Sequence, residues 1–439
     1  FPSYLLYEPK QISMTSGFHH GHWGTLLPFL RACQRLGEPA RPAPEPKNPW
    51  PQLPEAPHGE IGRLSLEDLA LATLPPSIRK DWRQPIREAW GVFTEDGALQ
   101  RLQRFVNERL GGYEKDRSRA DLEENPNSQL SPYLRWGQLS ARDVYWAVQD
   151  SQLSKAQVKT FVRRLFWRDL AYFHYLHFPR MEREPIRQAY AAVRWRHDPE
   201  MLRCWQKGRT GFPLIDASMR ELWQTGWCQQ NIRMAAASFL IEYCNIDWIE
   251  GAKWYEDTLV DVDVAINSMM WQNAGRSGID QWNFTISPTG ASQDPSGAYV
   301  RRWVPELKRL PNRYLHKPWE APESVLESAG VVLGETYPQR CILDTEKARS
   351  DSVESVVMMR RGIQHSQWND PEGYDVIQLP EGQLTKVFTR RDFRLPRSSS
   401  ASWTPKKRSR SRERSKGRSK LARRAWGQLK AVTETIDLD

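Results

Sequence analysis

Long apolar runs and paired cysteines are both missing from this sequence of 439 residues. No stretch approaches the roughly 18 consecutive apolar residues that a membrane-spanning helix needs, so we expect no membrane association. The five cysteines are far apart and form no CxxC pair, which argues against a disulfide framework and against a zinc site. A reducing compartment is therefore the default expectation.

A start methionine and a complete set of metal ligands are also missing. His19, His20 and His22 lie close together, but no further ligand is placed to complete a site, so we expect no metal. The chain begins at Phe1 in the middle of a pattern, and we expect its true N-terminus to lie upstream. A targeting peptide is compatible with this start, which keeps a chloroplast location open.

Positive charge is abundant, but it is concentrated near the C-terminus. The net charge is +10, and residues 406–424 hold eleven Lys or Arg and a single acid, so this stretch accounts for all of it. Residues 397–439 are rich in Arg and Ser and cannot bury enough apolar surface to fold, which predicts disorder. Such a tail suits DNA binding, nuclear import or phosphorylation, and it favours the nucleus as the location.

The patterns along the chain divide it into four parts. Residues 36–59 are dense in proline and predict an extended connector, so residues 1–59 form a short N-terminal piece with its linker. Residues 60–345 carry helical patterns, and the patterns weaken over 346–396, which predicts a weakly structured extension. The predicted tail covers residues 397–439.

Helical signals in the body are numerous. Residues 97–110 place apolar side chains three and four apart and end at two glycines, while Ser140 and Asp143 have the spacing of a capping box. We predict further helices over 155–178, 211–225, 229–245 and 248–260. No alternating β pattern competes with them, so the predicted fold class is all-α.

Several ordered motifs resemble the photolyase/cryptochrome family. The segment 246–271 ends in a D-x-D-x-x-x-N-x-x-x-W pattern, and GAYVRRWVPEL follows at 297–307. Residues 212–234, 127–140 and 315–326 are similar to further family segments, and the resemblance extends over about residues 1–345. It implies a helical FAD-binding domain, with residues 1–59 as the exit from the family's N-terminal α/β antenna domain.

The resemblance also implies where FAD binds. Residues 127–131 would hold the pyrophosphate, and the alternative is that they form an ordinary helix N-cap. Arg233 would neutralise Asp261, and the alternative is that Asp261 belongs to a solvated acidic loop. Asn267 would face flavin N5, where photolyases typically carry Asn and plant cryptochromes Asp. The residues implied to contact FAD are Tyr113, Asn127, Ser128, Gln129, Leu130, Ser131, Arg233, Asp261, Val262, Asp263 and Asn267.

Three tryptophans match the family's electron-transfer positions. Trp271, Trp248 and Trp195 would pass electrons in short steps from the surface to a photoexcited flavin, because indole is the most easily oxidised common side chain. The alternative is that they are core aromatics, as most tryptophans are.

The lesion contacts of repair enzymes are mostly altered here. Trp167 and Met234 are kept, whereas Arg164 replaces a Glu and Asn273 replaces a second Trp. Arg163, Arg168 and Arg117 accompany Arg164 and would bind phosphates, with a solvated helix face as the alternative. The candidate DNA-facing residues are Arg117, Arg164, Trp167, Gln230, Asn231 and Met234.

Two functions remain open from the sequence. The favoured one is a monomeric, blue-light-driven FAD protein, which acts as a photoreceptor or as a DNA photolyase. The alternative is a light-independent nucleic-acid-binding protein that acts through its Arg/Ser-rich tail.

Overall fold

The computed structural model describes residues 4–12, 24–43 and 81–395, except positions 82, 92 and 381. The predicted tail over 397–439 and most of the proline-rich connector lie outside the described residues, so their predicted disorder and extension stay expectations. His19, His20 and His22 lie outside them as well.

The described chain is predominantly helical, which confirms the predicted all-α class. Its helices are α2 (Leu26–Arg35), α3 (Gln84–Trp90), α4 (Glu95–Arg104), α5 (Tyr113–Asp116), α6 (Ser131–Trp136), α7 (Ala141–Gln149), α8 (Lys155–His177), α9 (Pro199–Gln206), α10 (Pro213–Thr225), α11 (Gln230–Ser238), α12 (Trp248–Thr258), α13 (Val264–Ala274), α14 (Ala298–Trp303), α15 (Asn312–Leu315), α16 (Glu323–Ala329) and α17 (Thr345–Gly362). Two π-helical turns, Phe105–Arg109 and Phe239–Tyr243, continue α4 and α11.

Local signals account for many of these helices. The capping box at Ser140 and Asp143 forms as predicted, because the side chain of each residue accepts a hydrogen bond from the backbone N–H of the other at the start of α7. The helices predicted over 155–178, 211–225 and 248–260 correspond to α8, α10 and α12. The one predicted over 229–245 is α11 together with its π-helical turn.

The C-terminal extension is more ordered than the sequence predicts. Instead of a weakly structured segment over 346–396, the structure has the 18-residue helix α17 and an antiparallel hairpin of β1 (Asp375–Gln378) and β2 (Leu384–Val387). Four-residue strands are too short for alternation to be recognised, and their order depends on contacts with distant residues. The all-α prediction missed this hairpin.

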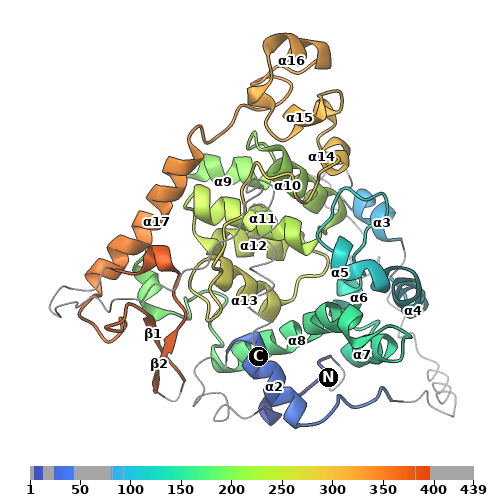
Figure 1. The fold of residues 1–439 in the computed structure, drawn as a ribbon, viewed down its shortest axis with the longest axis vertical. Helices are drawn as coiled ribbons and strands as arrows, with labels where there is room; N and C mark the ends of the chain where they lie inside the picture. Colours follow the sequence, from blue (N-terminus) through green and yellow to red (C-terminus); the bar gives the residue numbers. More distant parts are fainter. Residues whose placement is uncertain are drawn as a thin grey trace, which may run out of the picture.

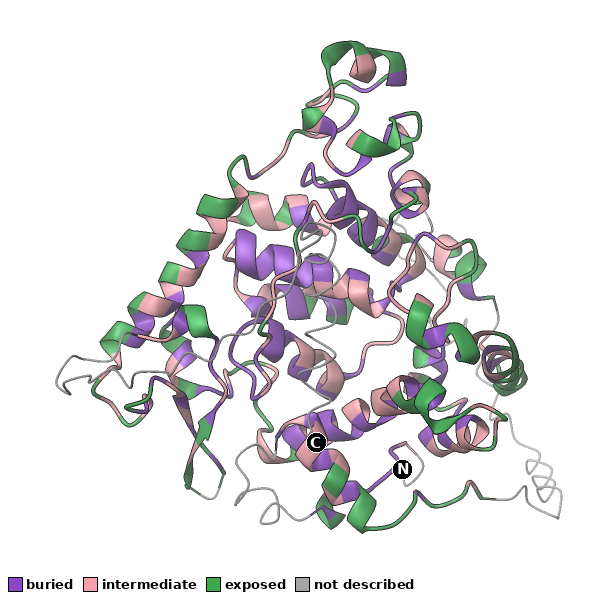
Figure 2. Cartoon of the chain, viewed as in Figure 1, coloured by how far each residue is buried: buried purple, intermediate pink, exposed green. Residues whose placement is uncertain are grey.

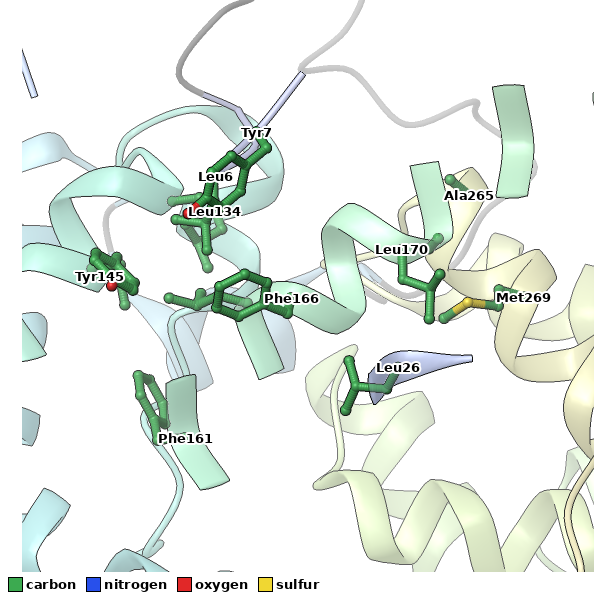
Figure 3. Packing of buried hydrophobic residues seen from close by; sticks show 14 of the residues in the cluster. Leu6, Tyr7, Leu26, Leu134, Tyr145, Phe161, Phe166, Leu170, Ala265 and Met269 are labelled. Carbon is green, nitrogen blue, oxygen red and sulfur yellow. The ribbon is translucent and has the colours of Figure 1, made fainter. Parts of the chain in front are cut away.

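The helices are arranged around two large hydrophobic clusters, and a third, smaller one packs α17 and Phe393 against Tyr190 and Val193. The first surrounds α8, where Leu170 is directed toward Met269 of α13 (Figure 3). The second contains α10, α11 and α12, and α10 and α11 are buried over most of their length (Figure 2). Helix α17 and the hairpin cover one side of the molecule, and α14, α15 and α16 form one corner of its triangular outline (Figure 1).

Buried carboxylates attach the extension to the helical body. Asp375 at the start of β1 is 2% exposed and forms ion pairs with Arg187, from the body, and Arg360, from α17. It also accepts a hydrogen bond from the Tyr190 hydroxyl at 2.9 Å. Glu242 pairs with Arg276 at 3.1 Å and with Arg390 of the extension at 2.5 Å. Each carboxylate therefore joins one arginine of the body to one of the extension.

The N-terminal segment is held by Asp169 in the middle of α8. Its carboxylate accepts the backbone N–H groups of Leu6 at 3.2 Å and Tyr7 at 2.9 Å. Burial raises the pKa of Asp169 to about 7, although these two hydrogen bonds oppose the shift. The folded protein therefore retains a proton here at pH values where the unfolded chain has lost it.

This retained proton predicts a pH dependence of stability. The contribution of Asp169 is largest below about pH 4 and falls by about 4 kcal/mol as the pH rises to about 7. We expect Asp169→Asn to flatten this part of the profile, measured as the free energy of unfolding in urea between about pH 4 and about pH 8. Asp150→Asn, at an exposed carboxylate paired with Arg41, should keep the wild-type profile, and an unchanged profile in Asp169→Asn would contradict the prediction.

Candidate functional site

One large cavity lies between α8, α11, α13 and the segment over 127–131, and the hairpin forms part of its wall. Its volume is about 2660 Å³. All eleven residues implied to contact FAD line it, and so do Trp271 and the six candidate DNA-facing residues. The structure thus brings together residues that are up to about 160 positions apart in the sequence, as the resemblance implies. Their contact with FAD stays a prediction.

Arg233 of α11 and Asp261 form a bidentate ion pair in this cavity. The two guanidinium Nη atoms donate to the two carboxylate oxygens at 3.1 Å and 2.9 Å, and Arg233 Nε donates to the Cys228 carbonyl at 2.7 Å. Burial disfavours the charged form of Arg233, but the nearby Asp261 outweighs it and keeps the pKa of Arg233 above its usual value. The Asp261 side chain is only 4% exposed, so the alternative of a solvated acidic loop is wrong.

Asp263 anchors the first turn of α13. It is the N-cap, and its carboxylate accepts the Ile266 N–H at 3.1 Å. The same group accepts hydrogen bonds from the hydroxyls of Tyr172, at 2.9 Å, and Tyr4. Burial and the neighbouring carboxylate raise the pKa of Tyr172, so its phenol stays protonated as a donor. Neither tyrosine carries a sequence signal for this contact, because the pairing joins three separate segments.

Asn267 lies one turn further along α13, so the anchored helix start fixes its position. Its Nδ2 donates to the Ala252 carbonyl of α12 at 3.1 Å. This bond orients the side-chain amide, and the amide oxygen retains its capacity to accept a hydrogen bond. An uncharged amide is therefore held in place at the cavity wall.

The segment over 127–131 has an unusual backbone. Gln129 adopts a left-handed conformation with φ of 54°, which non-glycine residues seldom adopt. Asn127 Nδ2 donates to Gln229 Oε1 at 2.8 Å, and Ser131 Oγ accepts from Trp227 Nε1 at 3.1 Å. Helix α6 begins at Ser131 without a side-chain cap, so the helix N-cap alternative for this segment is wrong.

Four arginines line the cavity near this segment. Arg117, Arg163, Arg164 and Arg168 are half-buried, and each has a buried guanidinium nitrogen with no hydrogen-bond partner among the described residues. Burial lowers the pKa of Arg117, and the charge of Arg164 lowers it further. A solvated helix face does not have these properties. Buried N–H donors of like charge fit a phosphate-bearing ligand, so the donor set suits FAD or a nucleic acid.

Two of the three tryptophans are buried, and the third is half-buried. Trp271 lines the cavity and is 3% exposed, Trp248 is buried, and Trp195 is half-buried at the edge of the second cluster. Two glycines permit this packing: a Cβ at Gly251 would lie 2.2 Å from the Trp271 ring, and one at Gly275 would lie 2.4 Å from Trp248. Electron transfer through the three indoles stays a prediction.

Two further aromatics beside Trp271 were missed by the sequence reasoning. The Tyr255 ring centroid is 5.0 Å from that of Trp271, and the Trp205 centroid is 6.3 Å away. Both are buried. Their positions in the sequence do not distinguish them from ordinary core aromatics.

The altered lesion position also faces the cavity. Asn273, which by the resemblance stands where the repair enzymes carry a second Trp, is 2% exposed. Its Oδ1 has no hydrogen-bond partner in the described part of the chain. The cavity wall is therefore polar at a position where the repair enzymes have an apolar one.

The described residues contain no cluster of three His, Cys, Asp or Glu side chains that could hold a metal ion. Nor is any helix of the described ranges long and apolar enough to cross a membrane.

Comparison with known proteins identifies the family. The model of the FAD-binding domain of DNA photolyase matches residues 161–357. The deoxyribodipyrimidine photo-lyase of Agrobacterium fabrum is 36% identical over 373 residues, covering 82% of this chain and 73% of that protein. Cryptochrome-1 of Arabidopsis thaliana is 33% identical over 368 residues, but the chain spans only 51% of its length.

A solved structure gives the same result. The crystal structure of a bacterial class III photolyase from Agrobacterium tumefaciens superposes with a TM-score of 0.73 at 36% sequence identity, and the match covers 82% of this chain and 72% of that one. The chain therefore belongs to the photolyase/cryptochrome family, and its cofactor is FAD.

Proposed function

We propose that this protein is a blue-light-driven flavoprotein whose FAD is photoreduced through Trp271, Trp248 and Trp195, and that it acts as a photoreceptor or as a DNA photolyase. The observation that carries this proposal is that Trp271 lines the same cavity as the Arg233–Asp261 pair and Asn267. When bound, FAD supplies light absorption in the blue and accepts an electron. The residues of the chain bind it, orient it and deliver the electron.

The cavity residues divide this work. Residues 127–131 line the cavity and supply side-chain amides, hydroxyls and backbone N–H groups that would hold the FAD pyrophosphate by hydrogen bonds. Arg233 and Asp261 are already paired, so together they bring no net charge to the flavin. Asn267 offers an amide oxygen held in place by its bond to Ala252, and it would accept a hydrogen bond without repelling a reduced flavin.

The first test is the flavin content of the purified protein. We expect blue-region flavin absorbance and its bleaching under blue light with an external reductant. Purified protein without flavin would refute the proposal.

Repair and signalling require a second experiment. The photolyase relatives favour DNA as a partner, and Arg164 and its neighbours would contact its phosphates. The altered positions, Arg164 and Asn273, favour signalling, because they remove a carboxyl group and an apolar wall from the lesion site. Illumination of the reduced protein with dimer-containing DNA decides between them: restored bases in single-stranded or double-stranded DNA indicate a photolyase, and their absence leaves a photoreceptor.

The Arg233–Asp261 pair gives a sharper prediction for FAD binding. Asp261→Ala removes a buried carboxylate and leaves the half-buried Arg233 guanidinium in the cavity without its charge partner. We expect the variant to lose FAD during purification, measured as the ratio of flavin to protein absorbance. Asp351→Ala, in an exposed pair with Lys347, is the control and should keep full flavin content. Full occupancy in Asp261→Ala would contradict the role of this pair.

The tail supports the second candidate function. Residues 406–424 carry enough positive charge to bind DNA without light. Deleting residues 397–424 should then weaken nonspecific DNA binding and reduce its salt dependence. Unchanged binding would assign DNA contact to the arginines of the body. The same charge favours a nuclear location, for which import of a fluorescent fusion with and without the tail is the test.

A further inference from the structure

A second, smaller pocket lies behind the segment over 127–131. It is lined by α3, the last turn of α10, α14 and the chain over 119–129, and α10 contacts both α3 and α14 (Figure 1). Its volume is about 190 Å³, well above the roughly 10–15 Å³ of cavity that a single water molecule needs. Gln129 and Trp227 line both this pocket and the large cavity, so the two are neighbours.

Two buried donors in this pocket have no acceptor. Gln229 is 3% exposed, and its Nε2 has no hydrogen-bond partner among the residues described. Trp303 Nε1 is also buried and equally lacks a partner there. A buried donor without an acceptor costs about 1–3 kcal/mol, so the pair indicates a ligand that accepts hydrogen bonds.

The charges around the pocket bear on the kind of acceptor. Arg302 and Glu123 line the pocket with exposed side chains, where water screens their charges, and Arg119 is already paired with Asp121 at 2.7 Å. Glu221 also lines it, but its carboxylate accepts the Tyr299 hydroxyl at 2.6 Å. Burial raises the pKa of Glu221 to about 7, which reduces its negative charge near neutral pH.

We propose that this pocket binds a small oxyanion of the size of inorganic phosphate, held by Gln229 Nε2, Trp303 Nε1 and Arg302. Gln229 connects the site to the large cavity, because its other amide atom, Oε1, accepts the hydrogen bond from Asn127. A bound anion fixes the Gln229 amide and, through it, the orientation of Asn127. The pocket does not overlap the candidate FAD contacts beyond Gln129, so it is a separate site.

The test is phosphate titration of the flavin-loaded protein, by calorimetry and by thermal unfolding, against chloride at equal ionic strength. We expect phosphate, and not chloride, to bind and to raise the melting temperature. Gln229→Glu keeps the acceptor for Asn127 but replaces the donor with a negative charge, and Trp303→Phe removes only the indole N–H. Each should weaken phosphate binding about tenfold or more.

A matched control exists in the same chain. Trp254 Nε1 is also buried without a described partner, but Trp254 does not line the pocket, so Trp254→Phe should keep wild-type phosphate binding. The proposal is overturned if phosphate acts no differently from chloride, or if Trp303→Phe binds phosphate like the wild type. Flavin absorbance is recorded in every sample, so a failure to bind FAD is seen separately from a failure to bind the anion.

Discussion

Trp271→Phe should keep FAD bound and slow its photoreduction by more than about tenfold, equivalent to about 1.4 kcal/mol in barrier height. Phe is much harder to oxidise than Trp, so the variant loses the electron donor that lines the cavity. Phe nevertheless fits the space, because its smaller ring can pack against Gly251 as the Trp271 indole does. The substitution also removes no hydrogen bond that the structure records. The measurement is the rate of flavin bleaching under blue light with an external reductant.

The neighbours of Trp271 provide the controls for this prediction. Trp248→Phe, at the second position of the proposed chain, should also slow photoreduction. Trp205→Phe alters an equally buried indole whose ring centroid is 6.3 Å from Trp271, but which is outside the proposed chain, and it should leave the rate unchanged. A normal rate in Trp271→Phe would refute the assignment, and a slow Trp205→Phe would redirect the electron path through Trp205.

Glu242→Gln should destabilise the protein by about 3–5 kcal/mol, because it removes the negative charge shared by two buried guanidinium groups. Arg276 and Arg390 are 1% and 4% exposed, so water cannot replace the lost partner; Arg390 keeps Asp392 at 2.6 Å, whereas Arg276 is left without a carboxylate among the described residues. The amide that replaces the carboxylate also places an N–H group against donors. The free energy of unfolding in urea measures the effect.

An exposed pair in α17 is the comparison for Glu242. Glu354 pairs with Arg361 at 2.7 Å, and both side chains are about half exposed, so Glu354→Gln should cost at most about 1 kcal/mol. A loss within about 0.5 kcal/mol in Glu242→Gln would mean that the buried cluster contributes nothing net to stability.

Sequence reasoning was most successful where the determinants are local. The capping residues and the spacing of apolar side chains predicted α7, α8, α10 and α12 with small errors at their ends. The ordered motifs also predicted the family and the residues around the large cavity, because each motif occupies one short segment.

Features that depend on contacts between distant segments were not predicted. The hairpin over 375–387 is held by Arg187, nearly 190 positions away, and no pattern within its eight strand residues records that contact. The hydroxyl groups of Tyr4 and Tyr172 reach Asp263 from the N-terminal segment and from α8. A sequence pattern contains no information on contacts between distant segments, so these contacts are revealed only by the structure.

The ion pairs of Asp375 indicate which residues belong to one cooperative folding unit. Residues 161–357 are sufficient to recognise the family, yet a chain cut after them would leave Arg187 buried without its carboxylate and Tyr190 without an acceptor. We therefore expect the body and the extension to unfold in one transition, and proteases to spare the junction between them. An expression boundary for this domain belongs beyond the fully buried Phe393 and the hydrogen bond from Arg394 to the Thr389 carbonyl, past the limits that the family pattern alone would suggest.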